Sequence, residues 1–410
     1  MELVSAALPA KTVVVAVDPG KVSNRVLLAS GERGLIGEPV SLPVQREGID
    51  RLCRLIEAAG GDQTVIALEA TGSLHVPWAA ELERRFPGSL RLFAPSETQA
   101  ARTQLGSRRI KDDDRDCAAL VSLARQGRGR PARTGILEAL LDAVRYRRRL
   151  ILQRKVARQH LHHQLNSLCP GLSAPQGHGR KLALETPSGR AVLACAVAFG
   201  GRPPSVRSLI ARAPGRITSA NAAWWAKRWR GCLGPPADAE LRAERLGRDV
   251  ARWQALAGDI EVVEAQIAVL LADSPGQVLT TLPGVAATRA AAFAVHALPI
   301  ERFESAEHLY SSTGLAPARY ESATIRKPRA ISREAPGERR DALMSIAWGL
   351  AQHSVAFGER DRELRARGMR PIEARVGLSR HACRLCHTML RTQQPFDEKR
   401  YARARHRRGR

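Results

Sequence analysis

The strongest constraint on the fold is an alternation of short β-branched segments with helical segments over residues 10–130. Lys11–Val17 (KTVVVAV) and Thr64–Leu68 (TVIAL) have the composition of buried strands, and turn residues follow each of them. Glu47–Ala59 lies between them and places its apolar residues at helical spacing. Further strands are predicted at Val22–Ser30, Gly34–Leu42 and Leu90–Ala94, and a further helix at Val76–Arg85. This order of elements predicts an α/β domain over residues 10–130.

The middle of the chain has a helical pattern. A Gly- and Arg-rich break at Gly127–Pro131 precedes Leu137–Leu168, which predicts a long basic helix. Pro170–Pro236 is expected to be rich in loops. Around Trp253, apolar residues recur mostly at steps of three, four or seven, which fits either a coiled-coil seam or a helix packed on its own domain. Residues 131–274 are therefore expected to form a helical, coiled-coil and linker region.

The last part of the chain, residues 275–390, is predicted to be a mostly helical domain. It begins with the turn Leu282–Val285 (LPGV), which precedes a helix of small residues at Ala286–Ala297. This arrangement resembles a helix-hairpin-helix, whose backbone amides can hold a phosphate, but a plain helix–helix turn fits equally well. Residues 391–410 are rich in arginine and are expected to be a disordered tail that contacts phosphates non-specifically.

Charge defines the kind of partner. The 410 residues include 65 Lys+Arg against 40 Asp+Glu, a formal net charge of +25. An excess of this size indicates a polyanionic partner, most plausibly nucleic acid, although a basic protein without such a partner is the simpler alternative. The seven cysteines are odd in number and scattered, which is typical of reduced thiols and not of a disulfide framework. No signal peptide and no membrane-spanning run is recognised, so an intracellular, cytoplasmic protein is expected.

Acidic residues stand at three positions where an α/β fold places its chemistry. Asp18 ends the first predicted strand and Glu69 ends the second core strand, and strand ends are the usual position of sites in such folds. Asp113 and Asp116 are three residues apart, so both project from one face of a helix. Clustered carboxylates repel one another unless cations neutralise them, and Mg²⁺ is the matching oxygen-seeking ion. Two such ions can clamp the attacking and leaving oxygens of phosphoryl transfer.

Each acid also has a simpler explanation. A single acid after a strand is more often a cap or turn residue, and a run of aspartates is typical of a helix N-terminus, where acids complement the dipole. Asp112 and Asp114 are further candidates, since Asp112 and Asp116 also share a helix face. The metal hypothesis therefore depends on the combination of Asp18, Glu69, Asp113 and Asp116 in a strongly basic chain.

These acidic motifs resemble a known family. VDPGK, ALEATG and KDDDRDCAAL are similar to the Asp-Glu-Asp-Asp domain of the insertion-sequence 110 family of transposases, the bridge-RNA-guided recombinases. The family usually reads Lys-Thr-Asp-x-x-Asp-Ala at the third motif, which aligns Asp113 and Asp116 with its metal-binding positions. Asp112 stands in place of the usual Thr, and Cys117 in place of the usual Ala. The resemblance implies a ribonuclease-H-like fold of the RuvC type for this domain.

A second resemblance covers the C-terminal region. LPGVAATRAAAFAVHA, RFESAEHLYSSTGLAPARYES and RKPRAIS are similar to the family's C-terminal transposase domain. That domain carries a catalytic Ser in a Tyr-x-Ser-Gly context, which aligns with Tyr320–Ala323, with Ala323 replacing the Gly. The resemblance therefore implies that Ser322 is a nucleophile. From the residues alone, Ser322 is an ordinary loop Ser, since a hydroxyl needs activation to attack.

The resemblance implies an RNA-guided DNA recombinase of an insertion element. The expected partners are donor and target DNA, a guide (bridge) RNA, and further copies of the chain in a dimer of dimers, with no membrane. Mg²⁺ held by the four carboxylates and a covalent phosphoserine intermediate are the expected chemistry, and a bacterial, nucleoid-associated protein is the expected location. The alternatives are a RuvC-like junction-resolving nuclease that needs only the carboxylates, and a non-catalytic nucleic-acid-binding protein. An actin-like ATPase is a weaker alternative that VDPGK prompts, without a second phosphate loop to support it.

One further cluster has the residue types of a zinc site. His381, Cys383, Cys386 and His387 lie close together in a segment with the pattern of an amphipathic helix. Four ligands so close on one helix cannot reach a tetrahedral centre without unwinding it, so zinc is not favoured here.

Overall fold

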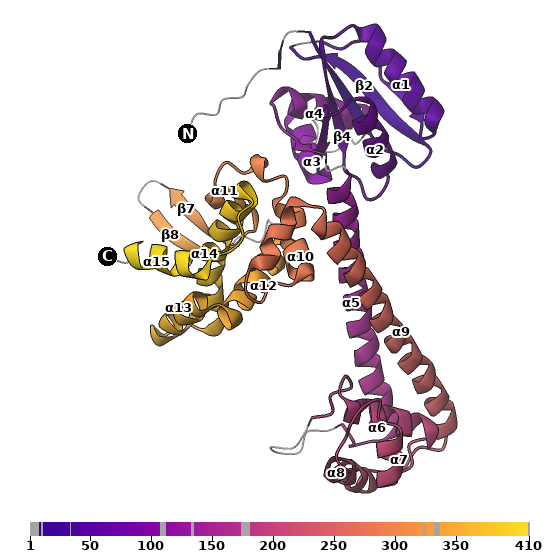
Figure 1. Cartoon of the computed structure of the whole chain (residues 1–410). Helices are drawn as coiled ribbons and strands as arrows, with labels where there is room; N and C mark the ends of the chain where they lie inside the picture. Colours follow the sequence, from indigo (N-terminus) through magenta and orange to yellow (C-terminus); the bar gives the residue numbers. More distant parts are fainter. Residues whose placement is uncertain are drawn as a thin grey trace. The chain divides into compact units, whose positions relative to one another are not determined.

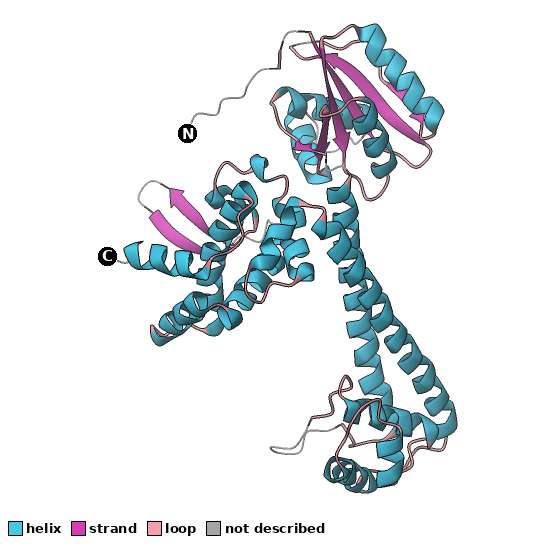
Figure 2. Ribbon diagram, in the orientation of Figure 1, coloured by secondary structure: helices cyan, strands magenta, loops and turns pink. Residues whose placement is uncertain are grey.

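The computed structural model describes residues 8–9, 11–32, 34–106, 112–132, 135–173, 181–322, 325–331 and 337–408 (Figures 1 and 2). The chain divides into two compact units, Met1–Gly135 and Ile136–Arg410. Within the described residues, no helix is long and apolar enough to cross a membrane.

The first unit is built on a six-stranded mixed sheet in the order β3-β2-β1-β4-β5-β6. Its strands are β1 (Thr12–Asp18), β2 (Ser23–Ser30), β3 (Val40–Pro43), β4 (Gln63–Glu69), β5 (Leu90–Phe93) and β6 (Arg130–Pro131). Its helices are α1 (Arg46–Ala59), α2 (Val76–Arg85), α3 (Pro95–Gln104) and α4 (Asp113–Arg125). β1, β4 and β5 are parallel, and the remaining pairs are antiparallel. The predicted α/β architecture of this region is confirmed.

Both faces of the sheet are covered, which explains the unbroken apolar run in β1. Val13, Val15 and Val17 face a cluster that includes residues of α1 and α2. Val14 and Ala16 face the opposite cluster, which includes residues of α3 and α4. A strand buried on both faces is apolar at every position, as the sequence indicated.

The prediction of a strand at Gly34–Leu42 is wrong over most of its length. The observed strand in this part of the chain is Val40–Pro43. Gly34 and Gly37 have φ values of +89° and +80°, which break an extended segment. Leu35 is exposed and forms only an isolated bridge with Ala29.

The second unit contains two long helices that pair in antiparallel orientation, α5 (Ile136–Leu168) and α9 (Ala239–Ala272). Arg147 Nε of α5 donates a hydrogen bond to Glu264 Oε1 of α9 at 2.8 Å. Gln164, nearer the end of α5, bonds Asp249, nearer the start of α9. Apolar residues expected to form a coiled-coil seam, such as Leu246 and Ile267, are buried within the chain, each in one of two separate hydrophobic cores. These seam positions therefore serve packing within the chain.

The core at one end of this pair belongs to three short helices. α6 (Pro187–Ala198), α7 (Val206–Ala211) and α8 (Ser219–Arg230) pack with the end of α5 and the start of α9. Side chains of Thr186, Ser205 and Thr218 cap the three helices by accepting backbone N–H bonds. The expectation of a loop-rich Pro170–Pro236 is correct only in part, because three short capped helices lie among its loops. Such short helices, separated by Gly and Pro, lack the long periodicity that reveals a helix in sequence.

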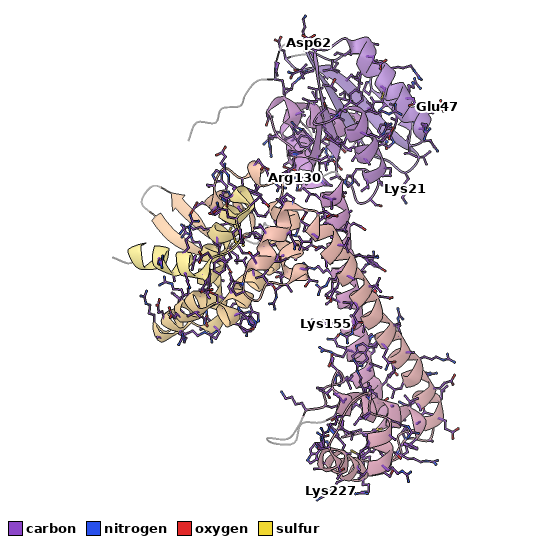
Figure 3. The ribbon with its side chains drawn as sticks, in the orientation of Figure 1. Lys21, Glu47, Asp62, Arg130, Lys155 and Lys227 are labelled. Carbon is purple, nitrogen blue, oxygen red and sulfur yellow. The ribbon has the colours of Figure 1, made fainter. Side chains whose placement is uncertain are left out.

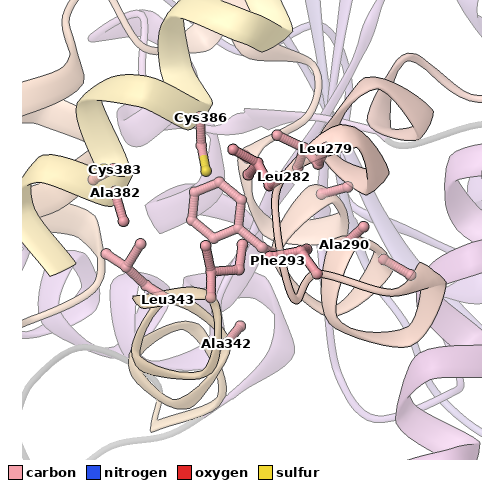
Figure 4. Close-up of a cluster of buried hydrophobic side chains, with 14 of the residues drawn as sticks. Leu279, Leu282, Ala290, Phe293, Ala342, Leu343, Ala382, Cys383 and Cys386 are labelled. Atoms are coloured by element: carbon pink, nitrogen blue, oxygen red, sulfur yellow. The ribbon is translucent and has the colours of Figure 1, made fainter. Parts of the chain in front are cut away.

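The core at the other end of the pair belongs to the C-terminal elements (Figure 4). These are η1 (Pro275–Thr281), α10 (Ala287–Ala297), η2 (Ile300–Arg302), α11 (Ala306–Ser312), β7 (Pro317–Ser322), β8 (Ile325–Ile331), α12 (Gly337–His353), α13 (Val355–Ala366), α14 (Pro371–Thr392) and α15 (Glu398–Arg408). Phe293 of α10 is fully enclosed among Leu282, Leu343 and Cys386. The predicted mostly helical domain is present, with a two-stranded antiparallel hairpin, β7–β8, that was not predicted.

The helix-hairpin-helix resemblance at Leu282–Val285 is only partial. The element before the turn is a 3₁₀ helix and not an α-helix. Gly284 has a φ of +73° and packs so closely on Gly349 that a Cβ would collide with backbone there. The Gly284 carbonyl accepts a hydrogen bond from Arg289 Nη1 at 2.6 Å. These contacts indicate a turn that packs onto α12.

The expected disordered tail is also wrong in part, because Glu398–Arg408 forms helix α15. Tyr401 stacks on Phe357 of α13, with ring centroids 4.9 Å apart. Glu398 Oε1 accepts hydrogen bonds from Ser354 Oγ at 2.8 Å and from the Ala356 amide at 3.0 Å. These contacts fix the helix despite its basic composition.

Candidate active site

Two acids close neighbouring parallel strands. Val17 of β1 pairs with Leu68 of β4, so Asp18 and Glu69 follow in register at the carboxyl ends of both strands. Adjacent strands lie about 4.8 Å apart. Asp18 and Glu69 continue the alternation that sends Ala16 and Ala67 to the α3/α4 face. Glu69 Oε1 accepts a hydrogen bond from Thr71 Oγ1 at 2.6 Å, which orients that carboxylate.

The third acidic motif forms the start of α4, on the same face. Asp112 is the N-cap residue and accepts a hydrogen bond from the Arg115 amide at 2.8 Å. Asp114 pairs with Arg25 of β2, and this guanidinium lowers the pKa of the Asp114 carboxyl. Asp113 is exposed at the first helical position. Asp112 therefore has the simpler role considered for these aspartates, that of a helix cap. Asp114 is held in an ion pair with Arg25.

Asp116 lies deeper than the other acids. Its side chain is only 5% exposed and forms an ion pair with Arg102 of α3, which is 17% exposed. A buried carboxylate is stable only when it is paired, so Arg102 compensates the charge of Asp116.

Cys117 shows that α4 begins beside the strand ends. Its thiol is buried and donates a hydrogen bond to the Arg25 carbonyl at 3.4 Å. Burial raises the pKa of the Cys117 thiol, and the negative charge of Asp18 raises it further. Asp18 therefore lies close enough to α4 for the two to interact.

The donor set suits Mg²⁺, because all four candidate ligands are carboxylates. Within the described residues, however, no three His, Cys, Asp or Glu side chains are close enough to hold a metal ion. Asp116 is bonded to Arg102, so its carboxylate must change partner to join such a site. The structure brings the acids to one edge of the sheet without arranging them around an ion.

Ser322 lies in the second unit, at the end of β7. Its backbone pairs with Ile325 across the β7–β8 hairpin, whose connecting residues, 323–324, are outside the described part of the chain, as are the side chains of residues 317–336. Ser311 and Ser312 end α11, before Gly314, as expected. The structure places Ser322 at the tip of a basic hairpin with Arg326 and Lys327 on the facing strand.

The cysteine and histidine cluster of α14 belongs to the hydrophobic core. Cys383 and Cys386 are fully buried, and Cys386 points toward Phe293 (Figure 4). His387 Nε2 lies 3.1 Å from the Phe303 carbonyl. The segment is a continuous helix, in agreement with the argument against zinc.

Arg25 and Arg102 are the residues of this site that sequence reasoning missed. Their partners lie 89 and 14 positions away, so no local pattern connects them. A basic residue opposite an acid can be recognised only once the sheet register and the packing of α3 on α4 are known.

The α/β fold with acids at its strand ends is consistent with a nucleic-acid-processing enzyme, and comparison with known families gives the class, the DEDD transposases. Residues 15–170 match a transposase family, the DEDD transposases of IS110 elements, and residues 276–362 match the transposase IS116/IS110/IS902 family. The chain belongs to the IS110 family of transposases, which are DNA-cleaving and recombining enzymes of insertion elements. No curated protein matches the chain. Residues 171–275 lie between the two matched regions.

Proposed function

We propose that this transposase is an RNA-guided DNA recombinase that exchanges strands through a covalent phosphoserine intermediate. The observation that carries the proposal is the in-register placement of Asp18 and Glu69 beside the acidic start of α4. Together with the RuvC-like, ribonuclease-H-type fold implied by the motifs, this edge is suited to phosphoryl transfer.

Asp18, Glu69, Asp113 and Asp116 are the proposed Mg²⁺ ligands. Asp113 is preferred to its neighbours because Asp112 caps α4 and Asp114 is paired with Arg25. Bound Mg²⁺ would stabilise the charge that develops on the transferred phosphate. Without bound Mg²⁺, Arg102 neutralises the Asp116 carboxylate. If Asp116 instead bound Mg²⁺, the Arg102 guanidinium would be able to contact a phosphate.

Ser322 is the proposed nucleophile. Its Oγ would form a bond to phosphorus as the bond to a sugar oxygen of the DNA strand breaks, and a sugar hydroxyl of another strand would then reverse the step. Because the acids and Ser322 belong to different units of the chain, the reaction requires the two units to meet on the DNA, within one chain or between two copies.

Guide RNA and self-association are further parts of this proposal. Within the basic stretch of helix α5, Arg147 and Arg148 are paired with acids of the chain. Arg145 and Lys155 are exposed and form no ion pair with the described residues, so they are suited to RNA phosphates. Apolar side chains are exposed along the helical pair, including Leu152 and Val156 on α5 and Val262 and Val269 on α9. They offer a surface for a second copy, in support of the dimer of dimers.

The decisive test replaces Ser322 by Ala. The variant should bind DNA and RNA normally but form no covalent protein–DNA adduct on a nicked substrate. Ser311→Ala is the matched control, since Ser311 is exposed at the end of α11 and should leave the adduct unchanged. Mass spectrometry identifies the attached peptide. Normal joining by Ser322→Ala, or an adduct on another residue, would contradict the proposal, and normal cutting without any adduct would support a RuvC-like hydrolase.

A further inference from the structure

The tip of the helical pair, residues 181–236 with α6, α7 and α8, has an extreme charge. It contains nine Lys+Arg against one Asp+Glu, a net charge of +8 in 56 residues. The cations come from all three helices, the segments between them and the residues just before α6. They are Lys181, Arg190, Arg202, Arg207, Arg212, Arg216, Lys227, Arg228 and Arg230. Figure 3 labels Lys227, which lies on α8 of the tip.

Most of these cations have no acidic partner among the residues that the structure describes. The one acid of the tip, Glu185, pairs with Arg158 of α5 at 3.1 Å. Arg228 donates hydrogen bonds to the Leu172 and Gly171 carbonyls. None of the other eight tip cations forms an ion pair with a residue of the described chain. Arg202, Arg207 and Arg216 are exposed. A surface that carries many exposed positive charges and few negative ones is typical of a site that binds a polyanion.

The aromatic residues of the tip indicate whether the polyanion is a single-stranded or a double-stranded nucleic acid. Proteins that bind unstacked bases present open aromatic faces to them. Here Trp225, Trp229 and Trp253 are buried in the tip core. The more accessible rings are covered by arginines, because Arg212 lies 4.7 Å from the Phe199 centroid and Arg228 lies 5.5 Å from that of Trp224. The tip therefore presents charge in place of stacking surfaces.

We propose that the tip binds the sugar–phosphate backbone of double-stranded DNA outside the cleavage site and without reading bases. Duplex DNA is the form chosen because a duplex offers phosphates with its bases stacked inside, and because the family acts on DNA. The tip lies between the two matched family regions and contains none of the proposed catalytic residues. The inference depends on the family assignment and is independent of the role of Ser322.

The test compares two triple variants of the full chain with the same change of charge. The tip variant is Arg202→Gln, Arg207→Gln and Arg216→Gln. The control variant is Arg46→Gln, Arg51→Gln and Arg54→Gln, three exposed positions on α1, which covers the sheet face opposite the acids. Affinity for a duplex DNA of random sequence is measured by fluorescence anisotropy across a salt series. Each phosphate contact contributes about 0.9 to the slope of log affinity against log salt, so the tip variant should bind about tenfold more weakly with a slope smaller by up to about 3.

The control variant should keep the affinity and slope of the wild type. A third variant, Arg202→Lys, Arg207→Lys and Arg216→Lys, keeps the charge and should bind DNA normally, which separates an effect of charge from an effect of misfolding. Equal losses in the tip and control variants, or no loss in the tip variant, would overturn the proposal. A loss confined to duplex RNA or to single strands, measured in parallel, would also overturn it. Cleavage activity does not enter the measurement, so failure of the Ser322 proposal leaves this test intact.

Discussion

The first unit and the tip use arginine in opposite ways. Residues 1–135 contain 19 Lys+Arg and 16 Asp+Glu, a net charge of +3, and arginines such as Arg25 and Arg102 are bonded to acids. The 56 residues of the tip carry +8 with one acid. In the first unit arginines such as Arg102 are paired with acids, whereas exposed tip arginines such as Arg202 and Arg207 form no ion pair with the described residues. The overall charge of +25 therefore conceals one nearly balanced region and one strongly basic region.

The largest effect is expected from removing an acid at the strand ends. Asp18→Asn or Glu69→Gln should lower strand cleavage in Mg²⁺ by more than about a hundredfold, because even residues that only support metal ligands contribute 10–100-fold. DNA binding should survive, since the cations are untouched. Cleavage of a labelled substrate and anisotropy provide the two measurements.

Asp112→Asn is the matched control for this prediction. Asn caps a helix about as well as Asp, so α4 and the cleavage rate should both be retained. Full cleavage by Asp18→Asn would contradict the metal assignment, and loss of cleavage in Asp112→Asn would shift it toward Asp112.

A smaller effect is expected from breaking the buried pair of the first unit. Arg102→Gln leaves the Asp116 carboxylate buried without its counter-charge, which should lower the free energy of unfolding by roughly 3–5 kcal/mol. Urea unfolding measures this change, and added Mg²⁺ should restore part of it if Asp116 is a ligand. Arg84→Gln breaks an exposed pair with Glu81 and should leave the stability nearly unchanged. Similar stabilities of the two variants would show that the pair contributes little.

The smallest effect concerns two thiols, Cys169 and Cys195, in the hydrophobic core that the tip forms with the end of α5 and the start of α9. Burial raises the pKa of Cys169 from 9.0 to about 12 and that of Cys195 to about 11. Both thiols stay protonated in the folded chain while the unfolded chain ionises, so stability is fully present below about pH 9 and is lost as the pH rises toward 11–12. A Cys169→Ala, Cys195→Ala variant should lose stability less steeply between pH 9 and 11 in urea unfolding at a series of pH values. Parallel slopes for the two proteins would refute this account.

The elements that the sequence predicted well are those with strong local patterns. The strand at Lys11–Val17 is observed as β1, and the helix at Glu47–Ala59 begins one residue earlier than predicted. Their apolar residues repeat at the period of the element, so local sequence alone is sufficient. The helices of the tip were missed because each is too short to show a long apolar period. The β7–β8 hairpin was missed because charged residues and one proline interrupt each strand.

The sequence predicted which residues belong to the candidate site but not how they are arranged in space. The position of Asp18 and Glu69 at strand ends was evident from the sequence, and the register of β1 and β4 adds that they are neighbours. The sequence could not distinguish Asp113 from Asp112 and Asp114, because this depends on the N-cap of α4 and on Arg25 from a distant strand. Arg25 and Asp114 are 89 positions apart, so no local sequence pattern can show that they are paired.

The antiparallel pairing of α5 and α9 has an evolutionary consequence. Their facing residues, such as Arg147 and Glu264, hold the two helices together before the chain enters the tip. The tip is thus inserted at the end of a hairpin whose two arms already meet, so it can be lengthened, exchanged or lost while the hairpin persists. A change of length or composition in the tip is therefore expected to leave the pairing of α5 with α9 intact.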